Sequence, residues 1–465
     1  MSYPLKNTRR GFLKHVALGS ALCATSYGQT KPTPSKKPAR DIMETEVLVV
    51  GGGVAGIGAA LGAARCGAKT LLLEDCGFFG GVAAWGVGMQ INQMRPKGVP
   101  RSVIHEMLIE KLLAFGEHAA IFGIRSPGNG SHALLVNTNY LKVAVLDVLD
   151  QVGCRYLVHT RAVDTVVEQN CVKGVVIATK RGLLTVRAQV VIDCTGDADV
   201  AYFAGAETMI ATGRISPQTL CFNTANVTPE QVKAGRAHFM QHQAEAKQTF
   251  PLIQKHMPGI GQVANGHYFY SNHPGTRDLG QFDVTDPEQF TRAECLSRRQ
   301  IVQTVESWRR FGGEDLKDID LVGTGARIGV RESRRLKGVY ILTEEDAMEG
   351  RKFADGIAWR SGNLDIGGIR CVRMKIHDVP YRALLPETVD GLLVAGRCIS
   401  ATHEGASAGK SMGNCMATGH AAGVAAALAV QKNQIPRDLD AKAIRARLMQ
   451  DQVDLDFSGQ TQDWM

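Results

Sequence analysis

Three glycines separated by one and two residues could bind the phosphates of a dinucleotide. Gly51, Gly53 and Gly56 form a GxGxxG motif directly after the apolar run 44–50. The first glycine permits a tight strand-to-helix turn, the second lets backbone N–H groups approach a pyrophosphate, and the third allows close helix packing. Glu74 stands where an acid could accept hydrogen bonds from an adenosine ribose, and a carboxylate there disfavours the 2′-phosphate of NADP.

The motif needs a strand before it and a helix after it, and the surrounding residues predict both. The β-branched run 44–50 is typical of a buried parallel strand, and a second strand at 71–73 ends at Glu74. Small residues between these strands predict a helix that packs closely on the sheet. A glycine-rich turn without a ligand is the alternative, but the complete β-α-β pattern favours dinucleotide binding.

Three later segments indicate a cofactor longer than NAD. They are 76–84 with its glycine pair, 190–207 with a strand that runs into Thr-Gly-Asp, and 389–430 with a strand, a loop and a long helix. A cofactor bound by both the beginning and the end of a chain is long, and FAD meets that requirement. Besides the first motif and Glu74, the predicted FAD contacts are Gly80, Gly81, Val163, Thr195, Gly196, Gly396, Arg397, Gly413 and Asn414.

The final helix is expected to serve the reduced flavin. Its N-terminus near 411–414 would present free N–H groups and a positive dipole end to the pyrimidine edge, and Gly413 would permit close approach. A helix of small residues that is simply well packed is an alternative, and the two interpretations are compatible.

The loop SATHEG precedes this helix and contains the predicted catalytic base, His403, with Glu404 as its orienting partner. Histidine titrates near neutral pH and could take a hydroxyl or ammonium proton as hydride leaves. A structural loop histidine is the alternative. Arg382, with Tyr381, is predicted to bind a substrate carboxylate, although an arginine that braces the sheet fits equally well. The dense charges of 330–335 are expected to form a salt-bridged scaffold around Glu332.

Together these segments resemble the FAD-dependent oxidoreductase family of the glutathione-reductase-like flavoprotein superfamily. The similarity extends from about Glu44 to the final helices and includes FFGG, VVIDCTGDAD, VPYRALLPE, GLLVAGRCISATHEG and CMATGHAAGVAAALA. One departure is visible, because Lys410 and Asn414 stand where an arginine and a threonine are expected. Lys410 is assigned to substrate binding, and what it binds is expected to differ, since lysine and arginine are not interchangeable at a planar site.

The resemblance implies an α/β fold in three layers: a Rossmann-like FAD-binding domain, made of a βαβ unit and a β-meander, with an inserted α+β substrate domain. The expected ranges are 44–86, 139–205 and 371–432 for the FAD-binding domain, 87–138 and 206–370 for the substrate or cap domain, and 433–465 for a C-terminal helix and tail. Periodicity agrees, since it predicts a helix from Tyr140, strands of a meander between 155 and 191, and one long amphipathic helix at about 288–311.

The N-terminus resembles a twin-arginine export signal. The stretch TRRGFLK at 8–14 matches every specified position, and the apolar segment that follows, 16–24, is shorter than the about 20 residues of a membrane-spanning helix. We therefore expect a signal peptide at 1–30, a basic proline-rich linker at 31–43, the twin-arginine machinery as a partner and a periplasmic location. An ordinary basic tail is the alternative.

Charge and cysteine content exclude several other classes. The whole net charge of +8 comes from the first 40 residues, which hold eight basic and no acidic residues, so the remainder is balanced. No nucleic-acid partner is expected. The 11 cysteines include no CxxC pair, and no HExxH occurs, so neither a disulfide framework nor a metal site is predicted. The scattered histidines, His256, His267 and His273 among them, show no metal-ligand spacing.

The predicted function is that of an exported FAD-dependent dehydrogenase or oxidase. It would transfer a hydride from a small organic substrate to flavin N5 and pass the electrons to an acceptor, which could be oxygen, a quinone or a redox protein. In one alternative the enzyme works in the opposite direction and reduces a carbon–carbon double bond, as fumarate-reductase-like flavoproteins do. A second uses FAD in a redox-neutral isomerase or lyase reaction.

Overall fold

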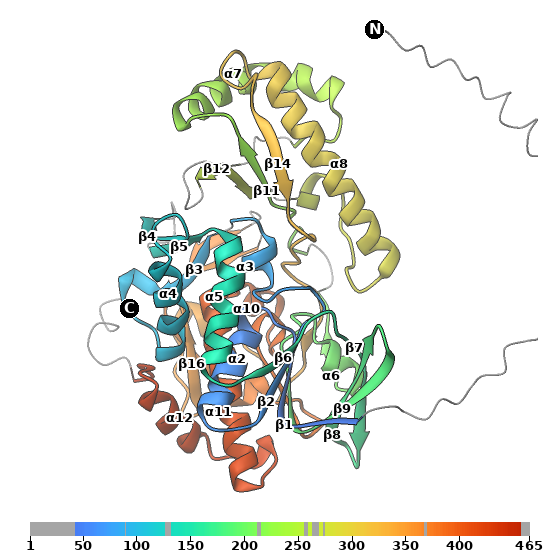
Figure 1. Ribbon diagram of the computed structural model, residues 1–465, viewed down its shortest axis with the longest axis vertical. Coiled ribbons are helices and arrows are strands. Elements are labelled where there is room, and N and C mark those ends of the chain that lie inside the picture. The colour runs from blue at the N-terminus through green and yellow to red at the C-terminus, as the bar shows by residue number, and fades with distance from the viewer. Residues whose placement is uncertain are drawn as a thin grey trace, which may run out of the picture. The chain divides into compact units, whose positions relative to one another are not determined.

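The apolar runs form a seven-stranded sheet in the computed structural model (Figure 1). Its order is β6-β2-β1-β9-β8-β7, and β20 pairs with the end of β9. The strands are β1 (Ile42–Val50), β2 (Thr70–Leu73), β6 (Arg155–Leu157), β7 (Arg161–Glu168), β8 (Cys171–Thr179), β9 (Gly182–Asp193) and β20 (Leu392–Val394). β7, β8 and β9 form the expected antiparallel meander. β6, predicted within it, instead pairs in parallel with β2 at the opposite edge.

The structure describes residues 42–88, 90–125, 132–211, 215–254, 259–262, 269–272, 275–366 and 370–456, which belong to one compact unit. The predicted signal peptide, most of the predicted linker, the end of the tail and the three histidines His256, His267 and His273 lie outside the described residues. β1 begins at Ile42, so the last two residues predicted as linker belong to the strand. No helix within the described ranges is long and apolar enough to cross a membrane.

The strands β2 and β20 and the end of β1 are buried on both faces, which explains why they read as continuous apolar runs. Val47 and Val49 of β1 face a core shared with α2 (Val54–Arg65), α5 (Thr138–Gln151) and α11 (Met412–Lys432). Leu48 and Val50 face a second core shared with the meander and α6 (Asp199–Phe203). The three layers are therefore helices, parallel sheet and meander, as the fold class predicts.

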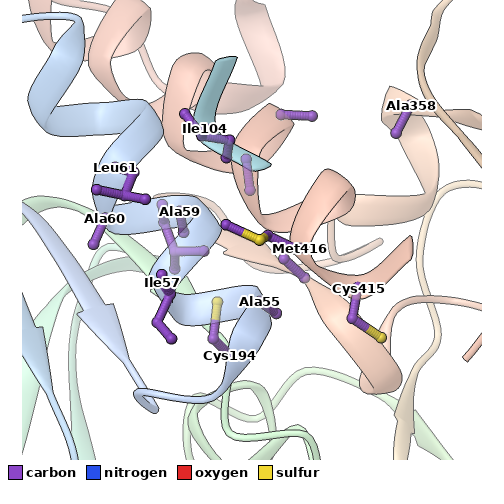
Figure 2. Close-up of a cluster of buried hydrophobic side chains, with 14 of the residues drawn as sticks. Ala55, Ile57, Ala59, Ala60, Leu61, Ile104, Cys194, Ala358, Cys415 and Met416 are labelled. Atoms are coloured by element: carbon purple, nitrogen blue, oxygen red, sulfur yellow. The ribbon is translucent and has the colours of Figure 1, made fainter. Parts of the chain in front are cut away.

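Helices α2 and α11 pack backbone against backbone because glycines line their contact. A Cβ atom on Gly419 would lie 1.9 Å from the carbonyl oxygen of Ala55, and one on Gly423 would lie 2.1 Å from that of Ala59. Figure 2 shows Met416 of α11 beside Ala59 in this buried cluster. The small residues of the two helices thus join the first and the last parts of the chain.

A separate apolar core supports the inserted unit. Its sheet has the order β12-β13-β11-β14, and Phe222, Phe239 and Trp308 are buried beside it. The strands are β11 (Phe222–Ala225), β12 (Gly259–Gln262), β13 (Phe269–Asn272) and β14 (Asp320–Thr324), and the helices are α7 (Pro229–Thr249) and α8 (Pro287–Phe311). We call these elements the cap; most are labelled together in Figure 1. α8 agrees with the predicted amphipathic helix at about 288–311, whereas α7 is a second long helix that the periodicity did not predict.

Parts of the expected substrate domain pack elsewhere. The helix α4 and the strand β5 share the core of α2 and α11, as does the strand β16. The cap core is therefore smaller than 87–138 and 206–370 combined. The other elements are α3 (Val82–Trp85), β3 (Ile91–Arg95), α4 (Val103–Ala114), β4 (Ala120–Arg125), β5 (His132–Val136), β10 (Thr208–Met209), β15 (Arg335–Leu336), α9 (Glu344–Glu349), β16 (Gly356–Arg360), β17 (Asn363–Asp365), β18 (Cys371–Arg373), β19 (His377–Pro380), α10 (His403–Ser407) and α12 (Ala441–Gln450).

Candidate functional site

A cavity of about 840 Å³ extends along the carboxyl ends of the parallel strands. Its walls come from the turn between β1 and α2, the end of β2, the loop after β9 and the start of α11, with Val284, Thr285 and Phe290 contributed by the cap side. This is the edge at which open α/β sheets bind ligands. The predicted site residues that line it are Gly51, Gly53, Glu74, Gly81, Thr195, Gly196, Arg397 and Lys410.

The three motif glycines have three different surroundings. Gly51 has φ +101°, and a Cβ atom there would lie 2.5 Å from the carbonyl oxygen of Cys194. A Cβ on Gly56 would lie 1.8 Å from the carbonyl oxygen of Gly51, so this glycine permits helix packing and does not line the cavity. A Cβ on Gly53 would meet no protein atom closer than 3.9 Å and would occupy cavity space. The protein alone does not require glycine at 53, but a bound pyrophosphate would.

The second glycine loop closes against the first. Gly80 donates its N–H to the carbonyl oxygen of Gly52 at 2.8 Å and forms a parallel bridge with Gly53. Gly81 has φ +53°, and a Cβ there would lie 2.8 Å from the Cα of Gly53. No side chain caps α2, whose N-cap is Gly53, so its first N–H groups are available to an anion. The second glycine loop thus packs directly against the phosphate-binding turn.

Glu74 lies at the end of β2 and is 5% exposed. Its carboxylate accepts hydrogen bonds from the N–H groups of Gly52 and Cys76, each at 2.8 Å. Burial and the neighbouring Asp75 raise the pKa of Glu74 to about 7. The carboxylate is thus oriented by the phosphate-binding turn itself, at the position predicted for a ribose acceptor.

The three consecutive groups Glu74, Asp75 and Cys76 could also reach one cation, since their ligand atoms lie within 4.8 Å of one another. Arg327 already faces two of them, at 2.7 Å from Asp75 and 2.9 Å from the Cys76 sulfur. The guanidinium supplies the positive charge that this cluster needs, so we assign no metal to it.

The loop after β9 is held by a buried carboxylate. Asp193 accepts hydrogen bonds from the N–H and hydroxyl of Thr195 at 3.0 and 2.7 Å, and from the N–H of Ala201 at 3.0 Å. Gly196 has φ +82°, and a Cβ there would lie 3.0 Å from the Arg397 guanidinium. These contacts fix the loop at the cavity wall between the two ends of the site.

Arg397 pairs with Asp197 at 2.7 Å, a residue that the sequence did not single out although it directly follows Thr195 and Gly196. Although burial opposes ionisation, Arg397 and the Ser333 hydroxyl hold the pKa of Asp197 below its ordinary value. Gly396 does not line the cavity, and a Cβ atom there would lie 2.7 Å from the Cβ of Ala55. Its role is to let the loop pack on α2.

At the start of α11 the structure changes two assignments. A Cβ on Gly413 would lie 2.0 Å from the carbonyl oxygen of Gln93, so this glycine accommodates β3. Asn414 is fully buried; it accepts a hydrogen bond from Arg101 at 2.8 Å and donates to the carbonyl oxygen of Ser361 at 2.9 Å. Neither residue lines the cavity, because the Gly413 position faces the backbone of β3 and the Asn414 side chain is held by Arg101, Ser361 and Ser411.

The α11 residues that do line the cavity are Met412 and Cys415, together with the N-cap Ser411. The sequence predicted the start of α11 correctly, but not which side of the helix faces the cavity. A glycine permits close approach of either backbone or a ligand, so Gly413 could not tell the two apart.

Lys410 lies next to this terminus and lines the cavity. It donates a hydrogen bond to the backbone carbonyl of Asp365, whose carboxylate pairs with Arg331 at 2.5 Å. Burial and the nearby Arg331 lower the pKa of Lys410 to about 7. Arg331 and Arg334 were expected to pair with Glu332, but they line the cavity and bind Asp365 and Asp199 instead. Asp365, on a three-residue strand without a motif, left no signal in the sequence.

The predicted base has a different partner from the one expected. Nδ1 of His403 lies 2.5 Å from Oε1 of Glu332, which also accepts a hydrogen bond from Arg335 at 2.9 Å. Glu404 makes no side-chain hydrogen bond or salt bridge in the described structure. Neither His403 nor Glu404 lines the cavity. His403 therefore connects α10 to the segment that carries Arg331 and Arg334.

Three further predicted residues lie away from the cavity. Arg382 forms a salt bridge with Asp355 at 2.9 Å and is half exposed, which agrees with the bracing alternative. The Tyr381 hydroxyl donates to the carbonyl oxygen of Pro436 at 2.7 Å inside the core. Val163 lies in β7 beside the lining residue Ala162, but its own side chain points out of the site. Strand alternation places neighbouring side chains on opposite faces.

A family model described as "FAD dependent oxidoreductase" matches residues 46–448, which is most of the chain. The chain belongs to this family. It has the Rossmann-like fold of such enzymes, and FAD is its cofactor by family membership. At Gly53 the cavity has room that a Cβ atom would fill. FAD supplies the hydride-accepting N5 when bound, and the residues around the cavity supply binding and orientation.

Individual relatives of this oxidoreductase are distant. A thiamine thiazole synthase from Methanococcus vannielii is 33% identical over 174 residues, which cover 34% of this chain and 59% of the relative. A geranylgeranyl bacteriochlorophyll reductase-like protein from Thermoplasma acidophilum is 16% identical, with a TM-score of 0.46 over 89% of this chain and 85% of that one. An L-proline dehydrogenase from P. horikoshii is 13% identical, with a TM-score of 0.40 over 85% and 95%.

Proposed function

We propose that this oxidoreductase oxidises a small organic substrate, transfers the hydride to flavin N5, and works in the periplasm after folded export. The observation that supports a bound dinucleotide is Gly53, whose missing Cβ leaves cavity space where the motif presents the α2 N–H groups. The same cavity continues to Lys410 at the other end. The cavity therefore connects the first β-α-β unit with the start of α11.

Different parts of the cavity would hold different parts of FAD. The turn at Gly51 and Gly53 would take the pyrophosphate, and Glu74 would accept from the ribose. The α11 terminus beside Ser411, which no side chain caps, would face the flavin's pyrimidine edge with its positive dipole end. The cap side, through residues such as Phe290, would then contact the substrate.

The first test is the flavin itself. Purified protein should be yellow and contain FAD, and anaerobic addition of the correct substrate should bleach it. A screen of alcohols, amines, hydroxy acids and unsaturated acids would identify the substrate class. Folded protein without FAD would contradict the proposal.

The same experiment separates the alternatives. Oxidation of pre-reduced flavin by an unsaturated acid would favour double-bond reduction, and an unchanged flavin spectrum during turnover would favour an isomerase or lyase. The thiazole synthase match covers one third of the chain, so the proposal takes no substrate from it.

Export rests on the stretch TRRGFLK. Segments from both ends of the chain would bind FAD, so the protein would have to fold around the cofactor before export. The twin-arginine machinery exports folded proteins. Replacing both arginines, Arg9→Lys with Arg10→Lys, should retain the protein in the cytoplasm in a fractionation experiment. A periplasmic double variant would contradict this part of the proposal. The electron acceptor, whether oxygen, a quinone or a redox protein, would be found by reoxidising the reduced enzyme with each.

A further inference from the structure

We propose that Lys410 binds a carboxylate group of the substrate at the α11 end of the cavity, so that the enzyme acts on small organic acids. This inference rests on the proposed oxidation of a small organic substrate and names its chemical class.

Six cationic side chains line the cavity, and four of them have a carboxylate partner. The four pairs are Arg327 with Asp75, Arg331 with Asp365, Arg334 with Asp199, and Arg397 with Asp197. The two others, Arg161 and Lys410, form no salt bridge within the described residues. A half-buried lysine without a counter-ion is costly, so an anionic ligand would stabilise Lys410.

The two remaining cations lie at opposite ends. Arg161 begins β7, directly after Thr160, whose N–H donates to the carbonyl oxygen of Glu74 at 2.9 Å. It therefore belongs to the ribose end. Lys410 precedes the N-cap of α11 and contacts β17, at the end expected for the substrate and the flavin ring.

The surroundings of Lys410 favour an anion. The ammonium donates to a neutral acceptor, the backbone carbonyl oxygen of Asp365, whose carboxylate is already paired with Arg331. The Nε–H of Arg331 has no acceptor in the described structure. The uncapped terminus of α11, a helix of 21 residues, adds a positive dipole end beside the same group. Glu332, the other nearby acid, is already bound to Arg335 and His403.

The geometry also accounts for the choice of lysine. A single rotatable ammonium can donate to Asp365 and to a ligand oxygen at once, whereas a guanidinium fork would need more room and a planar partner. The site would therefore take one carboxylate oxygen beside the paired Arg331, without bidentate recognition by residue 410.

The test uses FAD-loaded enzyme and simple probes. Acetate, glycolate and succinate are titrated while the perturbation of the flavin absorbance is followed, with acetamide as the neutral analogue. Lys410→Met should weaken carboxylate binding about tenfold or more, because a charge-assisted hydrogen bond is lost. Lys410→Arg, which keeps the charge but not the compact ammonium, should weaken it less than Lys410→Met does. Acetamide binding should not change. Lys432→Met, which removes an exposed lysine from the last turn of α11, away from the cavity, is the matched control and should leave carboxylate affinity unchanged.

The inference would be overturned if the parent enzyme bound no carboxylate, or if the Lys410→Met enzyme bound carboxylates as tightly as the parent. In the second case, a lowered flavin midpoint potential in Lys410→Met would show that the charge of Lys410 acts on the flavin. If Lys410→Met loses FAD, Lys410→Gln, which keeps a donor for the Asp365 carbonyl, replaces it. Failure of the proposed function is distinguishable, because an enzyme that binds carboxylates through Lys410 but is never bleached would refute oxidation alone.

Discussion

Nδ1 of His403 lies 2.5 Å from Oε1 of Glu332, a residue 71 positions earlier in the chain. Glu332 is buried, and besides His403 it binds Arg335 and the N–H of Ser216. Although burial opposes it, the contact with His403 holds the pKa of Glu332 below its ordinary value. The pair therefore joins α10 to the segment that carries Arg331 into the cavity wall.

Substitution His403→Ala should lower stability more than catalysis. Loss of one partner of a buried carboxylate should reduce the free energy of unfolding by about 1–3 kcal/mol. The rate of flavin reduction should stay within about tenfold of the parent, whereas loss of a general base typically costs about 10²–10⁴-fold. Denaturant unfolding and stopped-flow bleaching measure the two effects.

Glu404→Ala is the matched control, because Glu404 is the next residue of α10 and its side chain makes no hydrogen bond or salt bridge in the described structure. Its unfolding free energy should change by less than about 0.5 kcal/mol. A His403→Ala enzyme of normal stability with a hundredfold slower reduction would contradict the bracing role and restore His403 as the base.

The two glycines Gly53 and Gly56 should respond differently to alanine. Gly53 has an extended backbone with φ −69°, and a Cβ there would enter the cavity without touching protein. Gly53→Ala should therefore fold normally but bind FAD at least about tenfold more weakly, because the methyl group occupies the pyrophosphate approach. Flavin retention on dialysis and the melting temperature of the apoprotein check both parts.

Gly56→Ala provides the contrast, since its Cβ would lie 1.8 Å from the carbonyl oxygen of Gly51. Overpacking of this kind costs about 1–3 kcal/mol or more, so the apoprotein itself should lose stability. If Gly53→Ala retained FAD at parental affinity, the assignment of the pyrophosphate to this turn would be wrong.

The FAD-binding turn was predictable because its signals are local. The GxGxxG spacing and the apolar run before it fall within one β-α-β unit, and the structure places β1 and β2 within two residues of the prediction. The meander and α8 were likewise visible from periodicity. α7 was not, because only Gly235, Phe239 and Ala246 of its 21 residues are buried. Its capping box, Thr228 with Gln231, was the available signal.

The site was less predictable because its contacts join distant segments. Asp365 and Lys410 are 45 residues apart, and nothing in either local sequence indicates the other. A glycine at 413 indicates that another group approaches the α11 backbone closely, but it does not indicate whether that group is a ligand or β3. Pairing among arginines and acids is set by tertiary packing, so the partner of Arg331 could be found only in the structure.

Carboxylate binding should depend on the protonation of Lys410. Burial first, and then Arg331 and Arg397, lower its pKa to about 7, while Asp365 and Glu332 oppose the shift. The protonated amine binds an anion and the neutral amine does not. Acetate affinity should therefore be highest below about pH 7 and fall as the pH rises toward about 9, far below the ordinary lysine pKa. In Lys410→Arg the affinity should stay constant over that range, and an equal fall in both enzymes would exclude Lys410 as the titrating group.

Asp451 should make the fold sensitive to acid. It is buried and lies 2.9 Å from Nε2 of His420, 2.8 Å from Arg447 and 3.3 Å from Arg65, so it ties the C-terminal segment to α11 and α2. Although burial opposes ionisation, hydrogen bonds from His420 and Arg447 hold the pKa of Asp451 well below its ordinary value. A carboxyl with a depressed folded pKa contributes stability above its unfolded pKa of about 3.9 and loses it as the pH falls further.

Asp451→Asn should thus lose about 1–3 kcal/mol at neutral pH, because the buried His420 and the partly exposed Arg65 and Arg447 lose their shared acceptor. Its unfolding free energy should also fall less steeply than the parent's between about pH 5 and about pH 2, since the linked proton is gone. Denaturant unfolding at a series of pH values measures both. Asp438→Asn, an exposed acid nearby that forms no salt bridge in the described structure, should behave as the parent does. Equal acid slopes in Asp451→Asn and the parent would show that another carboxylate controls acid unfolding.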